Sequence, residues 1–497
     1  MKFIRACDVI LFVMIVVVYE VGGRSWRCVA MAARTDPVEL QAVYAMMAAT
    51  GNGWAASIPD VCVKSGRWHG IECVQDGDYY HVVELSFGLV TDQATAFPSC
   101  AQHSFISPAV ANLTHLRKLG YFACCMENPQ RIPSEIGRLG DSLEALHLRN
   151  NGHVGIIPEE LAGLIKLRTF DVHGNSLAGT MPIWLSSLTE LEAMDISDNT
   201  FGGEVDGRTF DNLERLTVFD ASDNEFVGAL PDSIGRLRTL QKLDLSYNNF
   251  TGAIPTTIGD LSRLLSLNLA HNRFSGPLPE TMSNLSNLKS LDLQRNCFRV
   301  PIPASLGKLV KLEGLVLSES EFVGPIPSSF GSLSNIRALF LDGNKLTGTI
   351  PPALGDLTRV YELELSSNLL AGPVPFSSSF VSRLGRRLRL QNNEGLCYEF
   401  KTADSLTSDP GSTIRPSEQP PQLKICSSSS SNNQSVGSSE FFPPSHHPSI
   451  ALDSVAPAGS LKPAFEPSSA CSRISYLSYH AVKCFWFMTF LVIMSRC

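Results

Sequence analysis

The sequence has 497 residues, a formal net charge of −8 and 13 cysteines. The negative charge is mild and spread along the chain, which argues against a nucleic-acid partner, because such a partner calls for a basic stripe. No Cys-x-x-Cys pair is present, and the cysteines are too scattered for a zinc module. Their role therefore depends on the compartment in which the protein resides.

Residues 1–33 predict export from the cell. Met1–Arg5 is a short basic start, Val9–Tyr19 is apolar, and small residues follow. This is the layout of a secretory signal peptide. An uncleaved membrane anchor is the alternative, but the apolar run is shorter than the roughly 20 residues needed to span a bilayer. Export makes the Asn-x-Ser/Thr motifs candidate glycosylation sites, and these lie at Asn112, Asn249, Asn284 and Asn433.

Residues 34–90 predict an N-terminal cap that begins with a helix. Asp36 is the expected N-cap residue, Pro37 suits the first turn, and Glu39 is placed to complete a capping box. Apolar residues then follow at helical spacing, and the glycines at 51 and 53 end the helix. A first, irregular strand is expected over residues 82–90.

The oxidising compartment allows the cap to be crosslinked. Cys62 and Cys73 are the expected cap disulfide, which would contribute roughly 3 kcal/mol by the loop-entropy argument. Cys100 is expected to pair with Cys124, although the adjacent Cys125 remains an alternative partner.

The region from 91 to 393 is dominated by one repeated segment. Its asparagines recur every 24 or 25 residues, a step within the range of leucine-rich repeats. Ser320 occupies this place in one copy, and Asn393 closes the series. The predicted structural ladder consists of Asn151, Asn175, Asn199, Asn224, Asn248, Asn272, Asn296, Asn344 and Asn368.

Each repeat position has a physical reason. Leu243 and Leu245 are two residues apart, so on a strand both point into the core, while Asp244 faces the other way. The asparagine amide can satisfy backbone groups left unpaired at the bend that follows. A single repeat cannot bury its apolar face, so the copies must stack. The predicted fold class is an α/β leucine-rich-repeat solenoid with a parallel sheet on its concave face and disulfide-capped ends.

The second half of each repeat, Leu-x-Gly-x-Ile-Pro, resembles the plant-type leucine-rich repeat. That class forms extra strands with this segment. The segment Gly203–Asp206 lacks the proline, and Val300 replaces the glycine in another copy. Local irregularity is expected at both places.

The composition of the C-terminal part changes twice, from the last repeat to a polar segment and then to an apolar tail. Residues 394–426 are the expected C-terminal cap, closed by a Cys397–Cys426 disulfide, and Cys297 is expected to be a buried free thiol. Residues 427–470 are rich in Ser and Pro and predict a disordered stalk. The tail 471–497 has an apolar run too short to span a membrane and fits a glycolipid-anchor (GPI) signal. The alternative is a tail without function.

The sequence contains no catalytic, cofactor or metal-binding motif, and no kinase signature follows the repeats. The aspartates that recur between strand leucines are expected to be structural. Two apolar residues interrupt this polar column, and charged residues flank them. An exposed apolar patch rimmed by charges is typical of a binding hot spot, and sequence drift is the competing interpretation. The candidate ligand-binding residues are Arg295, Val316, Glu319 and Phe340.

The cap carries the most specific resemblance. Gly51-Asn-Gly-Trp54, Gly66-Arg-Trp68-His-Gly-Ile-Glu-Cys73 and residues 387–397 closely resemble the Piriformospora indica-insensitive protein 2-like leucine-rich-repeat receptor-like proteins of plants, which are related to Too Many Mouths. The resemblance spans about residues 38–413. It supports the pairs made by Cys100 and Cys397.

The resemblance implies a kinase-less receptor-like protein on the outer side of the plasma membrane. Such a protein would recognise a peptide, microbial or protein ligand and signal through a partner receptor kinase, including in plant–fungus interaction. The alternative is a secreted inhibitor of a wall-degrading enzyme, similar to polygalacturonase-inhibiting proteins.

Overall fold

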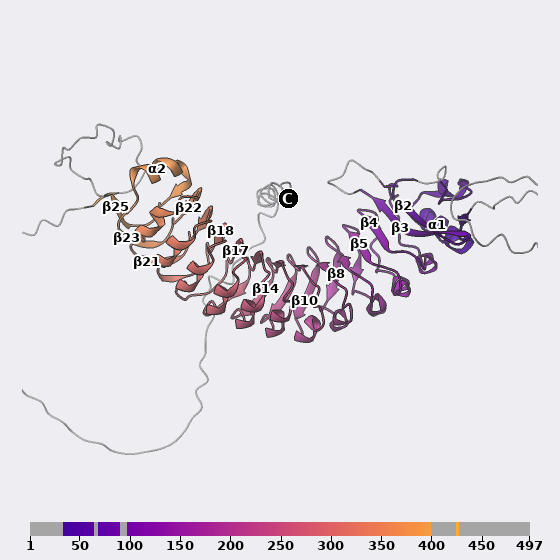
Figure 1. The fold of residues 1–497 in the computed structure, drawn as a ribbon, viewed down its shortest axis with the longest axis horizontal. Coiled ribbons are helices and arrows are strands. Elements are labelled where there is room, and N and C mark those ends of the chain that lie inside the picture. The colour runs from indigo at the N-terminus through magenta and orange to yellow at the C-terminus, as the bar shows by residue number, and fades with distance from the viewer. Residues whose placement is uncertain (1–32, 64–67, 90–96, 399–423, 427–497) are drawn as a thin grey trace, which may run out of the picture.

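In the computed structural model, the described residues are 33–63, 68–89, 97–398 and 424–426. They form one curved solenoid that runs from the indigo N-terminal cap to the orange C-terminal end (Figure 1). The predicted signal peptide, stalk and C-terminal tail, with Asn433, lie outside the described residues. No helix within the described ranges is long and apolar enough to cross a membrane.

The principal sheet is parallel and takes one strand from each repeat. Leu243 aligns with Leu267 on the next strand, and Leu267 aligns with Leu291, so the buried leucines of successive repeats stack into one continuous core. The predicted fold class is confirmed. In spatial order the strands are β1 (Arg34–Thr35), β3 (Tyr79–Gly88), β4 (Lys118–Phe122), β5 (Ala145–Arg149), β7 (Thr169–Asp171), β9 (Ala193–Asp195), β11 (Val218–Asp220), β13 (Lys242–Asp244), β15 (Ser266–Asn268), β17 (Ser290–Asp292), β18 (Gly314–Val316), β20 (Ala338–Phe340), β22 (Glu362–Glu364) and β24 (Leu388–Arg389).

The Leu-x-Gly-x-Ile-Pro segments form a second layer of short parallel strands. This layer is interrupted near Val300, where only an isolated bridge joins Pro301 to Val323. The irregularity expected there is present. The first group comprises β6 (Val154–Gly155), β8 (Ser176–Gly179), β10 (Thr200–Glu204), β12 (Glu225–Gly228), β14 (Asn249–Gly252) and β16 (Arg273–Phe274). The second comprises β19 (Val323–Pro325), β21 (Lys345–Gly348), β23 (Leu369–Pro373), β25 (Gly395–Tyr398) and β26 (Lys424–Ile425).

The irregularity expected at Gly203–Asp206 is absent, because β10 continues the second layer through Glu204. Asp206 takes the place of the proline with a φ of −68°, and its side chain accepts a hydrogen bond from the Arg208 amide. A capping aspartate therefore replaces the fixed φ of proline at this helix start.

A short 3-10 helix returns the chain to the next strand in most repeats. Proline is the residue before nine of the described 3-10 helices, for example Pro255 with a φ of −66°. The 3-10 helices are η1 (Gly53–Ser57), η2 (Pro108–Asn112), η3 (Ser134–Leu139), η4 (Glu159–Gly163), η5 (Ile183–Ser187), η6 (Gly207–Phe210), η7 (Asp232–Arg236), η8 (Thr256–Asp260), η9 (Glu280–Asn284), η10 (Ala304–Lys308), η11 (Ser328–Ser332), η12 (Pro352–Asp356) and η13 (Gly385–Arg387). The α-helix α2 (Ser378–Leu384) replaces a 3-10 helix near the C-terminal end.

The N-terminal cap begins with α1 (Pro37–Ala49), and Asp36 accepts hydrogen bonds from the amides of Val38 and Glu39. The expected capping box is wrong. The Asp36 amide donates to the Tyr80 carbonyl, and the Glu39 carboxylate turns away from the helix start. Pairing of β1 with β3 supplies the backbone partner that the glutamate would otherwise provide.

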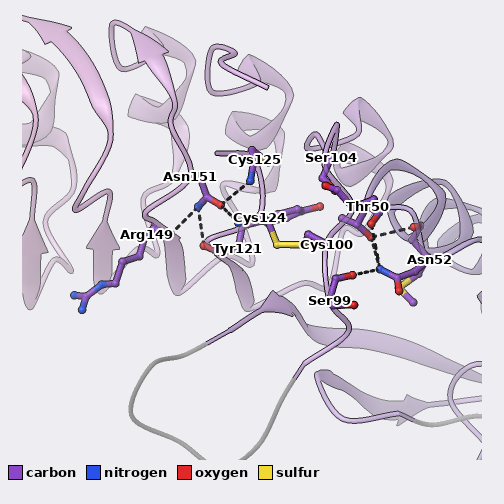
Figure 2. Close-up of a disulfide and its surroundings, with 12 residues drawn as sticks. Thr50, Asn52, Ser99, Cys100, Ser104, Tyr121, Cys124, Cys125, Arg149 and Asn151 are labelled. Carbon is purple, nitrogen blue, oxygen red and sulfur yellow. Dashed lines mark hydrogen bonds between the residues drawn. A yellow bond between two sulfur atoms is a disulfide. The ribbon is translucent and has the colours of Figure 1, made fainter. Parts of the chain in front are cut away.

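The disulfides close both ends of the solenoid. Cys62 bonds Cys73 on β2 (Ile71–Asp76), which pairs antiparallel with β3. Cys100 bonds Cys124, and the adjacent Cys125 is a buried free thiol (Figure 2). At the other end, Cys397 bonds Cys426.

The predicted free thiol at Cys297 is wrong, because this cysteine is disulfide-bonded. Cys297 is 8% exposed and directly follows the ladder residue Asn296. It lies between the two groups of second-layer strands, where this layer is interrupted.

The ladder asparagines join consecutive repeats. Asn248 Nδ2 donates to the carbonyls of Ala221 and Leu245 at 2.9 and 3.2 Å, while its Oδ1 accepts from the Phe226 amide at 3.1 Å. Asn151 makes the equivalent contacts next to the Cys100–Cys124 disulfide, where its Oδ1 accepts from the Cys124 amide (Figure 2). Each amide thus satisfies backbone groups at the bend of its own repeat and of the preceding one.

Candidate ligand-binding surface

The inner column is the set of middle residues on the strands of the principal sheet. Neighbours in this column are aligned by the parallel register, as Asp220 is with Asp244. Its aspartates accept hydrogen bonds from the backbone amide two residues later, such as Asp244 from Ser246 at 3.1 Å. These carboxylates therefore hold the strand ends, which is a structural role. The column is His147, Asp171, Asp195, Asp220, Asp244, Asn268, Asp292, Val316, Phe340 and Glu364.

Cations balance the N-terminal half of the inner column. Arg149 contacts the carboxylates of Asp171 and Asp195, both at 3.0 Å. Lys242 contacts Asp220 at 2.7 Å. The positive charge of Lys242 also lowers the pKa of Asp244, but burial has the larger effect. Desolvation, and then the charge of Asp220, raise the pKa of Asp244 to about 6.

Asp292 is the least compensated carboxylate of the column. Its polar contacts are with the backbone and side-chain nitrogens of Gln294, at 3.0 and 3.5 Å. The side chain is only 4% exposed. Desolvation by this burial raises the pKa of Asp292 to about 7.

A second row of side chains, here called the outer row, precedes the ladder residues on four consecutive repeats. It consists of Tyr247, His271, Arg295 and Glu319, with φ values of 53°, 54°, 54° and 52°. Glycine, asparagine or aspartate fits this left-handed conformation with the least strain. Other repeats place such residues there, for example Gly174 and Asp198. Four large side chains in succession are therefore an unusual choice, of the kind found where strain serves function.

The outer row forms two adjacent pairs. The rings of Tyr247 and His271 stack with centroids 3.9 Å apart and 15° between their planes. Arg295 Nε contacts Glu319 Oε2 at 3.1 Å. Burial, and then the positive charge of Arg295, lower the pKa of His271 to about 4. The imidazole is thus neutral near pH 6, and the row offers a flat aromatic face followed by a cation and an anion.

The predicted site residues are only partly assembled as expected. Val316 and Phe340 are aligned on adjacent strands, and Arg295 with Glu319 lies at the nearby strand ends. Val316, however, is 7% exposed and is not part of an exposed apolar patch. Column positions on neighbouring strands are about 4.8 Å apart, so Asp292 and Phe340 shield it from both sides. Phe340 itself is half-buried.

Tyr247 and His271 were missed because the sequence reasoning followed the column between the strand leucines. Tyr247 is 39% exposed and points to solvent from the position before Asn248. The available signal was the residue type before each ladder asparagine. A large residue there, where other repeats have glycine or aspartate, marks a departure from the repeat pattern.

The candidate glycosylation sites differ in access. Asn112 and Asn284 are exposed at the ends of η2 and η9. Asn249 is half-buried on β14, where it aligns with Val227 of the neighbouring strand.

Comparison with known families identifies the repeat. One family model, described as leucine rich repeat, matches residues 222–274 and 238–298. A second leucine rich repeat model matches residues 142–164 and 335–357. These matches lie within the solenoid described above, and its repeats are leucine-rich repeats.

Two curated proteins of Arabidopsis thaliana are similar to parts of the chain. The chain is 55% identical to Protein Too Many Mouths over 138 residues, which is 27% of this chain and 27% of that protein. It is 34% identical to Piriformospora indica-insensitive protein 2 over 149 residues, which is 28% of this chain and 33% of that protein. The resemblance predicted from the sequence is confirmed, although the chain spans a third or less of each relative's length.

Solved plant ectodomains share the fold. The ectodomain of the Arabidopsis thaliana membrane receptor kinase GASSHO1/SCHENGEN3, in complex with Casparian Strip Integrity Factor 2, aligns with a TM-score of 0.56 and 31% identity over 61% of this chain and 38% of that chain. The plant peptide hormone receptor RGFR1, in complex with RGF2, aligns with a TM-score of 0.50 and 26% identity over 59% of this chain and 50% of that chain.

Proposed function

We propose that this protein is a non-catalytic, cell-surface receptor-like protein that binds a peptide, microbial or protein ligand. The observation that carries the proposal is the outer row, in which Tyr247, His271, Arg295 and Glu319 occupy left-handed positions on four consecutive repeats. An aromatic stack beside a charged pair is suited to an extended ligand, since aromatic residues and arginine dominate binding hot spots. Receptors with this fold that bind a peptide hormone support the ligand class.

We further propose that signalling depends on a partner receptor kinase in the plasma membrane. The proposed location is the outer face of the plasma membrane, through a C-terminal anchor. The resemblance to Piriformospora indica-insensitive protein 2 supports a role in plant–fungus interaction.

A secreted inhibitor of a wall-degrading enzyme is the second candidate, since the same concave surface can cover a protein partner. The two functions differ in the partner recovered. A receptor-like protein retains a membrane kinase, whereas an inhibitor retains a wall enzyme and abolishes its activity.

The test is a pull-down from plant membranes with the tagged full chain, followed by mass spectrometry. Each recovered partner is then measured against Tyr247→Ala, Arg295→Ala and Phe340→Ala. Tyr361→Ala is the matched control, because Tyr361 is 61% exposed and contacts Arg387 away from the outer row. We expect recovery of a receptor kinase and at least about tenfold weaker binding for the outer-row variants Tyr247→Ala and Arg295→Ala and for the inner-column variant Phe340→Ala, equivalent to about 1.4 kcal/mol.

Equal binding by all four variants would place the binding surface elsewhere. Recovery of a wall enzyme whose activity the purified chain inhibits would establish the second function instead.

A further inference from the structure

The N-terminal cap brings together two imidazoles and a buried carboxylate that the proposed function does not use. Glu39 lies in the first turn of α1, His81 lies on β3, and His115 precedes β4. His81 Nδ1 is 2.9 Å from Glu39 Oε1, and His115 Nδ1 is 2.7 Å from the same oxygen. Two ring nitrogens from distant chain segments thus converge on one carboxylate oxygen.

The surroundings hold this carboxylate in place. Glu39 Oε2 accepts a hydrogen bond from the Val82 amide at 2.8 Å. The Glu39 side chain is 3% exposed, whereas those of His81 and His115 are 15% and 47% exposed. No lysine or arginine among the described residues pairs with Glu39. A buried carboxylate in this position is stabilised by a nearby cation, because burial of an uncompensated charge is costly.

We propose that Glu39, His81 and His115 bind one Zn²⁺ ion. Two imidazole nitrogens and one carboxylate oxygen are a protein ligand set found at zinc sites that keep an open fourth position. Tetrahedral zinc places its ligand atoms about 3.3 Å apart, given metal–ligand distances of about 2.0–2.1 Å. The three ligand atoms already lie within 4.8 Å of one another, so small side-chain rotations are sufficient. The hydrogen bond from Val82 orients the carboxylate, as outer-shell contacts do at metal sites.

The open position would face a groove beside the cap. His81 and His115 line this groove, which has a volume of about 670 Å³ and is also lined by Thr114, Arg117 and Lys166. Water or a carboxylate of a bound molecule can occupy the fourth position there. The ion would also join α1 to the first strands of the principal sheet, since its ligands come from three separate segments.

The sequence reasoning missed this site because its residues are far apart. His81 and His115 are separated by 34 positions and match no metal-binding motif. Only the parallel pairing of β3 with β4 brings them together, with ring centroids 3.7 Å apart.

The test is isothermal titration calorimetry at pH 7, in which ZnCl₂ is added to the full chain after removal of any tag and dialysis against EDTA. We expect one equivalent of zinc to bind with a dissociation constant of about 10 µM or tighter and to raise the melting temperature, as a ligand specific for the native state does. His115→Gln and Glu39→Gln should weaken binding at least tenfold. His103→Gln is the matched control, because His103 is an exposed histidine outside the cluster.

The proposal is overturned if the parent chain binds no zinc, or if His115→Gln binds zinc as tightly as the parent. The His115 side chain is nearly half exposed, so we expect His115→Gln to fold. Its zinc affinity therefore tests the proposal even if Glu39→Gln fails to fold. These measurements use no protein ligand and are independent of the outer-row proposal.

Discussion

The ring of Tyr247 lies 3.9 Å from the ring of His271, its counterpart in the next repeat. Both residues have a left-handed backbone, with φ values of 53° and 54°. The same backbone conformation recurs before each ladder residue because the chain must bend there, and it directs the side chain away from the core. The repeat geometry thus places the two rings side by side, although its left-handed backbone conformation is unfavourable for side chains of this size.

Tyr247→Asn tests whether the stack serves binding rather than folding. Loss of an aromatic pair costs about 0.5–1.5 kcal/mol, but asparagine relieves left-handed strain of about 1–3 kcal/mol. We expect the free energy of unfolding to change by less than about 1 kcal/mol, while binding of the recovered partner falls. Urea unfolding and a direct binding titration give the two values. A large loss of stability with unchanged binding would assign the stack to the fold.

Asn248→Ala should have the opposite effect, although Asn248 is the next residue in the chain. Removal of its amide leaves backbone groups of two repeats unpaired, at about 1–3 kcal/mol for each buried group. Thermal stability and secretion should both fall, and Asn272→Ala should behave alike. Asn248→Ser is the matched control, because Ser320 occupies a ladder position and donates to the Leu293 carbonyl at 2.8 Å. An unchanged melting temperature in Asn248→Ala would contradict the structural role.

Asp292 predicts a pH dependence of stability. Its pKa is raised from the ordinary value of 3.8 to about 7 by burial. The native state therefore binds more protons than the unfolded state between these values, so this contribution to stability is fully present below pH 3.8 and is lost as the pH rises through 7. The full effect approaches about 4 kcal/mol at 1.36 kcal/mol per pKa unit.

Asp292→Asn should remove this contribution. The stability of the parent minus that of the variant should be larger at pH 4.5 than at pH 7.5, measured by urea unfolding. Asp232→Asn, at an exposed position of η7, is the control and should show no such trend. A difference that does not vary with pH would disprove the assignment.

Cys125 should be unreactive in the native protein. It is buried next to the bonded Cys124, and desolvation raises the pKa of its thiol to about 12. The thiolate is the reactive form of cysteine. Iodoacetamide at pH 8 should therefore leave Cys125 unlabelled in the native protein and should label it once the protein is unfolded, with no reductant present at either stage. Peptide mapping should then recover the Cys100–Cys124 bond. A Cys100–Cys125 bond would show that the pairing is wrong.

The proposed glycolipid anchor makes a separate prediction. If the tail after about residue 470 is replaced by a glycolipid, phosphatidylinositol-specific phospholipase C should release the protein from intact cells. Retention after treatment, with the C-terminal peptide still detected by mass spectrometry, would exclude this form of attachment.

The sequence by itself determined the repeat and its core. The spacing of Leu243, Leu245 and Asn248 sets the strand, its buried face and the bend, because period-2 alternation and a bend amide are local requirements. Repetition of this pattern is sufficient to predict stacking, since each repeat contacts only its neighbours. The cap helix and the cap disulfide were also predicted from local sequence patterns.

Only the tertiary structure decided how side chains from different repeats meet. It buried Val316 between its column neighbours, turned Glu39 from the helix start towards two histidines, and bonded Cys297. It also stacked Tyr247 on His271. The contacts of Val316, Glu39 and Tyr247 join residues 24 or more positions apart. The register of the sheet fixes such contacts, whereas spacing along the chain constrains only which residues can share a face.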